Sequence, residues 1–218
     1  MSQSPLFRSK DYVAVETAIK RFLNGQPDFI SKATANSTRA VGDAIQGVLG
    51  EHFHAIIGKH GGNCTADFAR RAMADLAFED RAGNYCVVDV KTHRLDTHFN
   101  MPNLTSVERL SRFYEADNNF FVVLSIAYNV VGTKVEVRRV HFVPIEFLSW
   151  ECLTIGALGW GQIQIANSNK ITVLPNNPRK DWMLEFCEIM LEFYPKEIVK
   201  IDRRIAHFKK LRTTWKKR

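Results

Sequence analysis

Hydrophobic residues along the chain alternate between stretches of helical spacing and short apolar runs. Apolar residues recur at helical spacing over residues 10–24, 39–60 and about 105–116, and again from residue 180 onward. Runs rich in β-branched and aromatic residues predict strands at 73–78, 85–91, 120–128, 134–143 and 161–165. A short helix is predicted over about 144–153. This order predicts the α/β class, a mixed sheet flanked by helices.

Turn and cap residues mark the ends of several of these segments. Asn24-Gly25-Gln26-Pro27 ends the first helix, and Gly61-Gly62 ends the second. Thr105-x-x-Glu108 has capping-box spacing at the start of the third. The polar segment 79–84 predicts a turn between two strands, and 129–133 is expected to connect another pair.

Size and composition fit one reduced, cytoplasmic domain. The chain has 218 residues, of which 45% are hydrophobic and 24% charged, enough to bury a full core. No apolar run approaches the roughly 20 residues of a membrane span, and the first residues lack the apolar region of a signal peptide. The four cysteines lie far apart without a CxxC pair, which gives a disulfide or zinc framework little support.

The basic charge is concentrated at one end of the chain. The formal net charge is +7, and residues 196–218 hold ten Lys/Arg against two acids, so the other 195 residues sum to −1. Apolar residues recur at intervals of 3, 4, 3, 3 and 4 in this segment, at Ile198, Ile201, Ile205, Phe208, Leu211 and Trp215. We expect a basic amphipathic helix with a polyanion partner, either nucleic acid or a membrane surface. Alternatively, the segment is a solvated tail, or the helix binds in the groove of a peptide-binding protein.

Three ionisable residues interrupt the apolar strands, namely Asp75, Asp89 and Lys91. Because strand side chains alternate, Asp89 and Lys91 point to one face while Val88 and Val90 enter the core. If the two strands pair as a hairpin, Asp75 reaches the same end of the sheet. Two carboxylates can hold a hard cation such as Mg²⁺, and the lysine can orient the attacking water beside a phosphate. This is the constellation of the PD-(D/E)xK nucleases, although a surface salt bridge is the plain alternative.

The surrounding sequence resembles the HincII-like branch of type II restriction endonucleases over roughly residues 40–195. Asp89-Val-Lys-Thr92 is followed, eleven residues after Lys91, by Pro102-Asn103-Leu104-x-Ser106. Further matches in the same order are Gly42-Asp-x-Ile-Gln46, Ser125-Ile-x-Tyr-x-Val-x-Gly132-x-x-Val-x-Val, Trp150, Gly161-Gln-Ile-Gln-Ile165 and Arg179-Lys-Asp-Trp182. The resemblance implies a restriction-endonuclease-like fold, with residues 1–218 as one endonuclease domain that ends in the basic helix.

The resemblance also implies roles for individual residues. Asp75 and Asp89 would be catalytic metal ligands, the backbone carbonyl of Val90 a further ligand, and Lys91 the catalytic lysine. Residues expected to contact DNA are Thr92 and Arg94 at phosphates, Asn100 against the base stack, Asn103 at a base edge, and Gly159 in the loop 156–161. Gln46 stands where the family often has Glu, which would weaken any second metal site, and Glu51 lies a little more than one turn further on.

The expected protein is therefore a Mg²⁺-dependent, sequence-specific DNA endonuclease from a bacterium or archaeon. A homodimer would cut both strands of a short palindrome, with blunt ends that carry 5′-phosphates. No GxxxxGK[ST] loop is present, so we expect no nucleotide cofactor, and we expect no membrane partner. Two alternatives stay open: a structure-selective repair or resolving nuclease of the same fold, and a non-catalytic DNA-binding module.

Overall fold

The structure is a computed structural model that describes residues 3–27, 30–64 and 74–218. The chain divides into two compact units, Met1–Asn176 and Asn177–Arg218. The first unit holds all the strands described, and the second consists largely of one helix.

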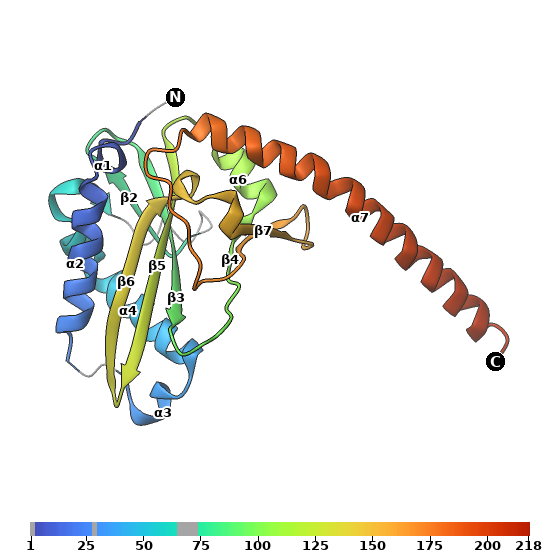
Figure 1. The fold of residues 1–218 in the computed structure, drawn as a ribbon, viewed down its shortest axis with the longest axis horizontal. Coiled ribbons are helices and arrows are strands. Elements are labelled where there is room, and N and C mark those ends of the chain that lie inside the picture. The colour runs from blue at the N-terminus through green and yellow to red at the C-terminus, as the bar shows by residue number, and fades with distance from the viewer. Residues whose placement is uncertain (1–2, 28–29, 65–73) are drawn as a thin grey trace. The chain divides into compact units, whose positions relative to one another are not determined.

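The main sheet of the first unit has five strands in the order β1-β2-β3-β5-β6 (Figure 1). They are β1 (Gly61–Cys64), β2 (Leu76–Asp80), β3 (Tyr85–Arg94), β5 (Asn119–Val131) and β6 (Lys134–Pro144). The β3–β5 pair is parallel, and the other pairs are antiparallel. A second, three-stranded antiparallel sheet has the order β4-β8-β7, with β4 (Asn103–Ser106), β7 (Leu153–Gly156) and β8 (Gln162–Ile165). Both sheets together make the mixed α/β architecture that the sequence predicts.

Helices cover one face of the main sheet. The helices of this unit are α1 (Pro5–Arg8), α2 (Asp11–Gly25), α3 (Lys32–Ala35), α4 (Thr38–Ile57) and α6 (Val107–Phe113). α2 packs on β6 and α4 packs on β3, and the two helices contact each other (Figure 1). Short 3₁₀ turns follow at Gly58–His60, Ile145–Phe147 and Trp150–Cys152.

β3 and β5 form the centre of the core. Their parallel register runs from Tyr85↔Asn119 to Arg94↔Tyr128. Nine of the thirteen residues of β5 and six of the ten residues of β3 are buried, as expected of central strands. Valine, isoleucine and phenylalanine supply most of this buried surface, which explains why the sequence predicts these strands well.

Two predicted segments differ from the structure. The helix expected over 144–153 is wrong, because the segment forms two 3₁₀ turns and then β7. The Ser149 N–H donates to the carbonyl of Thr172 (3.0 Å) and the Leu148 backbone pairs with Val173, so contacts with a distant segment replace helical bonds. The helix expected from Thr105 begins later, because Thr105 belongs to β4 and Ser106 caps α6 by accepting from the Arg109 N–H (3.1 Å).

Smaller differences concern strand ends. The predicted strand 73–78 appears as β2 from Leu76 to Asp80, and Met73 lies outside the described residues. The pair predicted at 120–128 and 134–143 extends until only Gly132 and Thr133 separate β5 from β6. Gly132 has a φ of +64°, a conformation that glycine adopts without strain in a tight turn.

The second unit contains α7 (Arg179–Trp215), a helix of 37 residues. The sequence predicts this helix from residue 180, and residues 196–215 of the expected basic segment 196–218 form its C-terminal part. The helix continues through Pro195. Within the part of the chain that the structure describes, no helix has both the length and the apolar content to cross a bilayer.

Candidate active site

Asp75 lies where the β2–β3 ladder ends. The ladder runs from Glu79↔Tyr85 to Leu76↔Val88. Beyond it, the Asp75 N–H donates to the Val88 carbonyl (3.0 Å), and Asp75 Oδ2 accepts from the Val90 N–H (2.7 Å). The Asp75 carboxylate thus accepts a backbone hydrogen bond from β3 at the point where the backbone pairing with β2 ends. It is held at the edge of β3. Antiparallel pairing of these strands, on which the predicted position of Asp75 depends, is confirmed.

Asp89 and Lys91 form a close ion pair on one face of β3. Lys91 Nζ donates to Asp89 Oδ1 at 2.7 Å, and Asp89 is only 5% exposed. Burial raises the pKa of Asp89 to about 7, although the Lys91 ammonium lowers it, and the nearby Asp75 charge adds to the increase. The carboxyl group therefore sits in an environment that resists its negative charge, and a further cation would favour the ionised form.

The unsatisfied oxygen of Asp89 fits a divalent cation. Asp89 Oδ2 is buried and accepts no hydrogen bond from the described residues. A buried polar atom without a partner is rare in folded proteins and is often explained by an ion or a water molecule. Carboxylate oxygens are the donors that Mg²⁺ prefers. Among the described residues, no group of three or more His, Cys, Asp and Glu side chains is close enough to hold a metal.

Gln46 on α4 contacts the backbone carbonyl that we expect as a further metal ligand. Gln46 Nε2 donates to the Val90 oxygen at 3.2 Å. A carbonyl oxygen has two lone pairs, so this bond leaves one acceptor direction. For Val90 to be a metal ligand as predicted, its carbonyl oxygen would bind the cation and accept the Gln46 hydrogen bond at the same time. Glu51 is exposed on the same helix.

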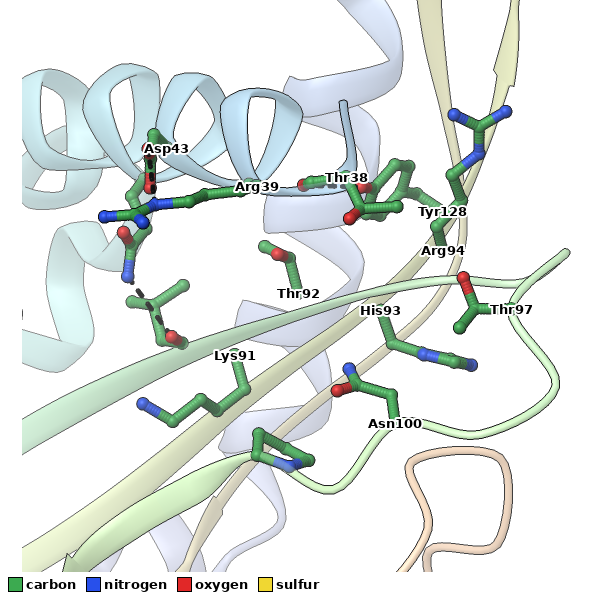
Figure 2. Close-up of a pocket in the computed structure, with 14 residues that line it drawn as sticks. Thr38, Arg39, Asp43, Lys91, Thr92, His93, Arg94, Thr97, Asn100 and Tyr128 are labelled. Atoms are coloured by element: carbon green, nitrogen blue, oxygen red, sulfur yellow. Dashed lines mark hydrogen bonds and ion pairs between the residues drawn. The ribbon is translucent and has the colours of Figure 1, made fainter. Parts of the chain in front are cut away.

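A cavity of about 330 Å³ lies beside this edge of β3, between α4 and the loop that follows the strand (Figure 2). Lys91 and His93 project from one face of β3 and Thr92 from the other, toward α4 (Figure 2). Lys91, Gln46 and Val90 line the cavity, whereas Asp75 and Asp89 are not among the lining residues. Lys91 therefore connects the carboxylate pair to the open space in which a ligand would be accommodated.

Thr92 lies under a glycine of α4. A Cβ atom on Gly42 would come within 2.6 Å of Thr92 Oγ1, so the helix approaches the strand as closely as it does because residue 42 has no side chain. Thr92 is half-buried and lines the cavity. Its expected phosphate contact would have to be made within this narrow space.

Arg94 is held by contacts within the protein. Its Nε donates to Asp96 Oδ2 (2.9 Å) and its Nη1 donates to the Ala35 carbonyl (2.8 Å) at the end of α3. The side chain is 19% exposed. Arg94 also lines the cavity, but a phosphate contact would compete with these two bonds. Arg39 on α4 is a more accessible cation at the cavity. Its side chain is 93% exposed, and its contact with Asp43 is long, with 4.0 Å between Nε and Oδ2.

The remaining predicted DNA contacts lie on the loop after β3 and on the small sheet. Asn100 is half-buried and lines the cavity. Asn103 is exposed at the start of β4, where its Oδ1 accepts from Gln164 Nε2 of β8 (2.6 Å). Gly159 is exposed between β7 and β8 with a φ of +59°. Pairing of β4 with β8 thus joins the Asn103 segment to the strand that follows the Gly159 loop.

His93 is a candidate site residue that the sequence reasoning missed. It follows Asp89 and Lys91 on the same face of β3, lines the cavity, and is 2% exposed. Its Nε2 lies 2.8 Å from Asn169 Oδ1, and its Nδ1 is buried without a hydrogen bond from the described residues. The period-2 alternation that groups Asp89 with Lys91 also includes His93, and this was the available signal.

Neither the models of known protein families nor a search of curated proteins gives a match to this chain. The structure brings Asp75, Asp89 and Lys91 together at one edge of β3, with a cavity on the Lys91 side. Asn103 and Gly159 belong to the neighbouring three-stranded sheet and its connecting loop.

Proposed function

We propose that the protein is a Mg²⁺-dependent DNA endonuclease of the type II restriction class, with a restriction-endonuclease-like fold. The observation that carries the proposal is the convergence of three residues: Asp75 is hydrogen-bonded to the edge of β3, beside the ion pair of the buried Asp89 and the half-buried Lys91. The antiparallel and parallel neighbours of β3 fix Asp89 and Lys91 through the backbone, and two hydrogen bonds hold Asp75 to β3.

Each residue of the trio has a distinct role. Asp89, through its unpartnered Oδ2, and Asp75 would hold the cation, with the Val90 carbonyl as a third oxygen. When bound, Mg²⁺ would offset the negative charge that develops on the attacked phosphate. Lys91 would turn its ammonium from Asp89 toward the phosphate and the attacking water, which its position at the cavity allows. In-line attack by water would leave a 5′-phosphate and a 3′-hydroxyl.

The restriction type follows from the sequence resemblance together with the placement of the specificity residues. Asn103 is exposed, and its amide would read a purine edge once its Oδ1 exchanged the bond from Gln164 Nε2 for one from the base; the Gly159 loop is also exposed. A homodimer with two such sites would cut both strands of a palindrome, one strand per subunit, with blunt ends. The positive charge of residues 196–218 favours a polyanionic substrate.

The proposal is tested by Lys91→Ala and Asp89→Asn, assayed on supercoiled plasmid and phage DNA in the presence of Mg²⁺. We expect each variant to lose at least about 100-fold in cleavage rate, because Lys91 would act at the scissile phosphate and Asp89 would hold the cation beside it. Thermal melts should show that both variants remain folded.

The same sheet offers a matched control. Glu136 and Arg138 on β6 form an acid-x-base pair with the same spacing, with Arg138 Nη2 at 2.7 Å from Glu136 Oε2. Arg138→Ala and Glu136→Gln should cleave like the wild type. Near wild-type cleavage by Lys91→Ala, or equal losses in the β6 variants, would contradict the assignment of the site.

A non-catalytic DNA-binding module is the second candidate, and the 2.7 Å ion pair between Lys91 and Asp89 favours it. In such a module the pair would serve only to neutralise two buried charges. The two functions differ in their response to metal. A module would bind DNA with and without Mg²⁺ and hydrolyse none, whereas the nuclease should bind in Ca²⁺ and cleave in Mg²⁺.

A further inference from the structure

One face of α7 carries a continuous apolar seam. Residues along it are spaced alternately by three and four positions from Leu184 to Trp215. One set, the a positions, is Leu184, Leu191, Ile198, Ile205 and Arg212. The other set, the d positions, is Cys187, Tyr194, Ile201, Phe208 and Trp215. The eight large apolar side chains among them are 38–67% exposed.

This spacing has the period of a coiled coil. An average interval of 3.5 residues keeps a stripe on one side of a helix that winds around a partner helix. The stripe expected from the sequence began at Ile198 and included Leu211. Extended to Leu184, the strict alternation instead passes through Arg212, and it covers more than four heptads. A single helix exposing so long a seam matches one half of a helix pair.

We propose that this seam binds α7 of a second copy of the chain, with the two helices antiparallel. The charge along α7 supports this direction. Residues 179–195 hold two basic and four acidic residues, a net −2, whereas residues 196–218 have a net charge of +8. Antiparallel pairing places each acidic half beside a basic half, and parallel pairing would place the two strongly basic halves together.

One antiparallel register aligns the whole seam. When Ile198 faces Ile201 of the partner helix, every a position meets a d position across the interface. Leu191 then opposes Phe208, and Leu184 opposes Trp215, so each smaller side chain faces a larger one. Alternation of large and small residues in facing positions fills a core without voids. The two-fold axis repeats each of these contacts once.

The flanking positions agree with the same register. Antiparallel helices bring like flanking positions together, and these pairs set orientation. In this register, the flanking pairs in which both residues are charged are Asp181 with Lys216, Glu188 with Lys209, and Glu197 with Arg204, and each pairs opposite charges. Parallel helices would instead pair Glu197 with Asp202 and Arg204 with Lys209, which repel.

Arg212 is the charged residue within the seam. In the proposed register it faces Cys187, the smallest side chain of the seam, so the long arginine stem can cross the interface and keep its guanidinium in water. A polar residue at one core position lowers stability but fixes the register, because any shift would place it against a large apolar side chain.

The inference concerns assembly and rests on α7 alone, so it stands whether or not the chain cleaves DNA. The experiment measures the dimer dissociation constant of the full-length chain by sedimentation equilibrium. Lys209→Glu should weaken the dimer about tenfold or more, because two Glu188–Lys209 attractions become repulsions. The double variant Glu188→Lys with Lys209→Glu should restore it. Lys210→Glu makes the same charge change one residue away, outside the interface, and should leave the dimer unchanged.

Other arrangements give different outcomes, and each would overturn the proposal. In a parallel pair, Lys209→Glu would tighten the dimer by attraction to Arg204, and Cys187 would form a disulfide with its counterpart under oxidation. In the antiparallel pair the two Cys187 thiols lie about 37 Å apart, because about 25 residues separate the facing positions. A monomeric chain, or a dimer that is insensitive to Lys209→Glu, would exclude the antiparallel pair. If Lys209→Glu and Lys210→Glu weakened the dimer equally and the chain bound DNA or anionic vesicles, the helix would have another use.

Discussion

Two carboxyl groups with raised pKa values illustrate how the same group behaves in two settings. Asp89 lies beside Lys91 and has a buried oxygen that a cation could satisfy. Glu16 on α2 lies away from the site, where its Oε1 accepts from the Phe142 N–H of β6 at 2.8 Å. Burial raises the pKa of Glu16 to about 7, and the bond from Phe142 opposes that increase. Glu16 therefore affects the fold, and Asp89 the proposed chemistry.

The pH dependence of stability should show the effect of Glu16. Between its ordinary pKa and about 7, the folded chain keeps a proton on Glu16 that the unfolded chain has released. Stability is thus lost as pH rises through this range. Glu16→Gln retains an acceptor and cannot ionise, so we expect its melting temperature to exceed that of the wild type by a few degrees at pH 8 and to match it near pH 4.5.

Circular-dichroism melts at both pH values check this, with Glu136→Gln on β6 as the control. An equal difference between wild type and Glu16→Gln at pH 4.5 and pH 8 would show that the substitution acts through packing and not through ionisation. Sodium chloride should change the result little, since the group is partly buried.

At the residue scale, the sequence could predict neighbours along a strand but not contacts across the fold. Alternation on β3 is a local rule, so the shared face of Asp89 and Lys91 was predictable. The hydrogen bond from the Val90 N–H to Asp75 depends on where β2 ends. The hydrogen bond from Arg94 to the Ala35 carbonyl joins residues 59 positions apart. Such long-range partners decide which side chains remain available to a ligand.

At the scale of elements, the contact between α4 and β3 fixes one wall of the cavity. Gly42 permits it, because any Cβ would meet Thr92 Oγ1 at 2.6 Å. Gly47 on the same helix has open space at the corresponding position. Long strands such as β3 and β5 were predictable, because they are rich in valine, isoleucine and phenylalanine and are buried in the core. The segment 144–153 was not, since its backbone bonds go to residues 172–173.

These two glycines make a matched pair for a stability measurement. Gly47→Ala should stabilise the protein by roughly 1 kcal/mol, through helix propensity alone. Gly42→Ala gains the same propensity but forces Thr92 or the helix to move, so we expect it to be about 1–3 kcal/mol less stable than Gly47→Ala. Urea denaturation of both variants measures the difference, and equal stability would show that the close approach has no energetic consequence.

At the scale of the whole molecule, charge and chemistry lie in different units. The first unit contains the Asp75–Asp89–Lys91 group and is close to neutral, and the second unit holds the excess of positive charge. A basic net charge alone fits many polyanion-binding proteins. The proposed function instead depends on three side chains at one strand edge, and the proposed assembly depends on a seam that begins well before the basic segment.

The most direct test of the nuclease proposal is the digestion of a genome of known sequence with the purified protein and Mg²⁺, followed by sequencing of the fragment ends. We predict discrete fragments whose ends all fall within one short palindrome, are blunt and carry 5′-phosphates, and which are absent in EDTA and with Lys91→Ala. Intact DNA under all metal conditions, or cleavage confined to branched or mismatched substrates, would contradict a restriction endonuclease.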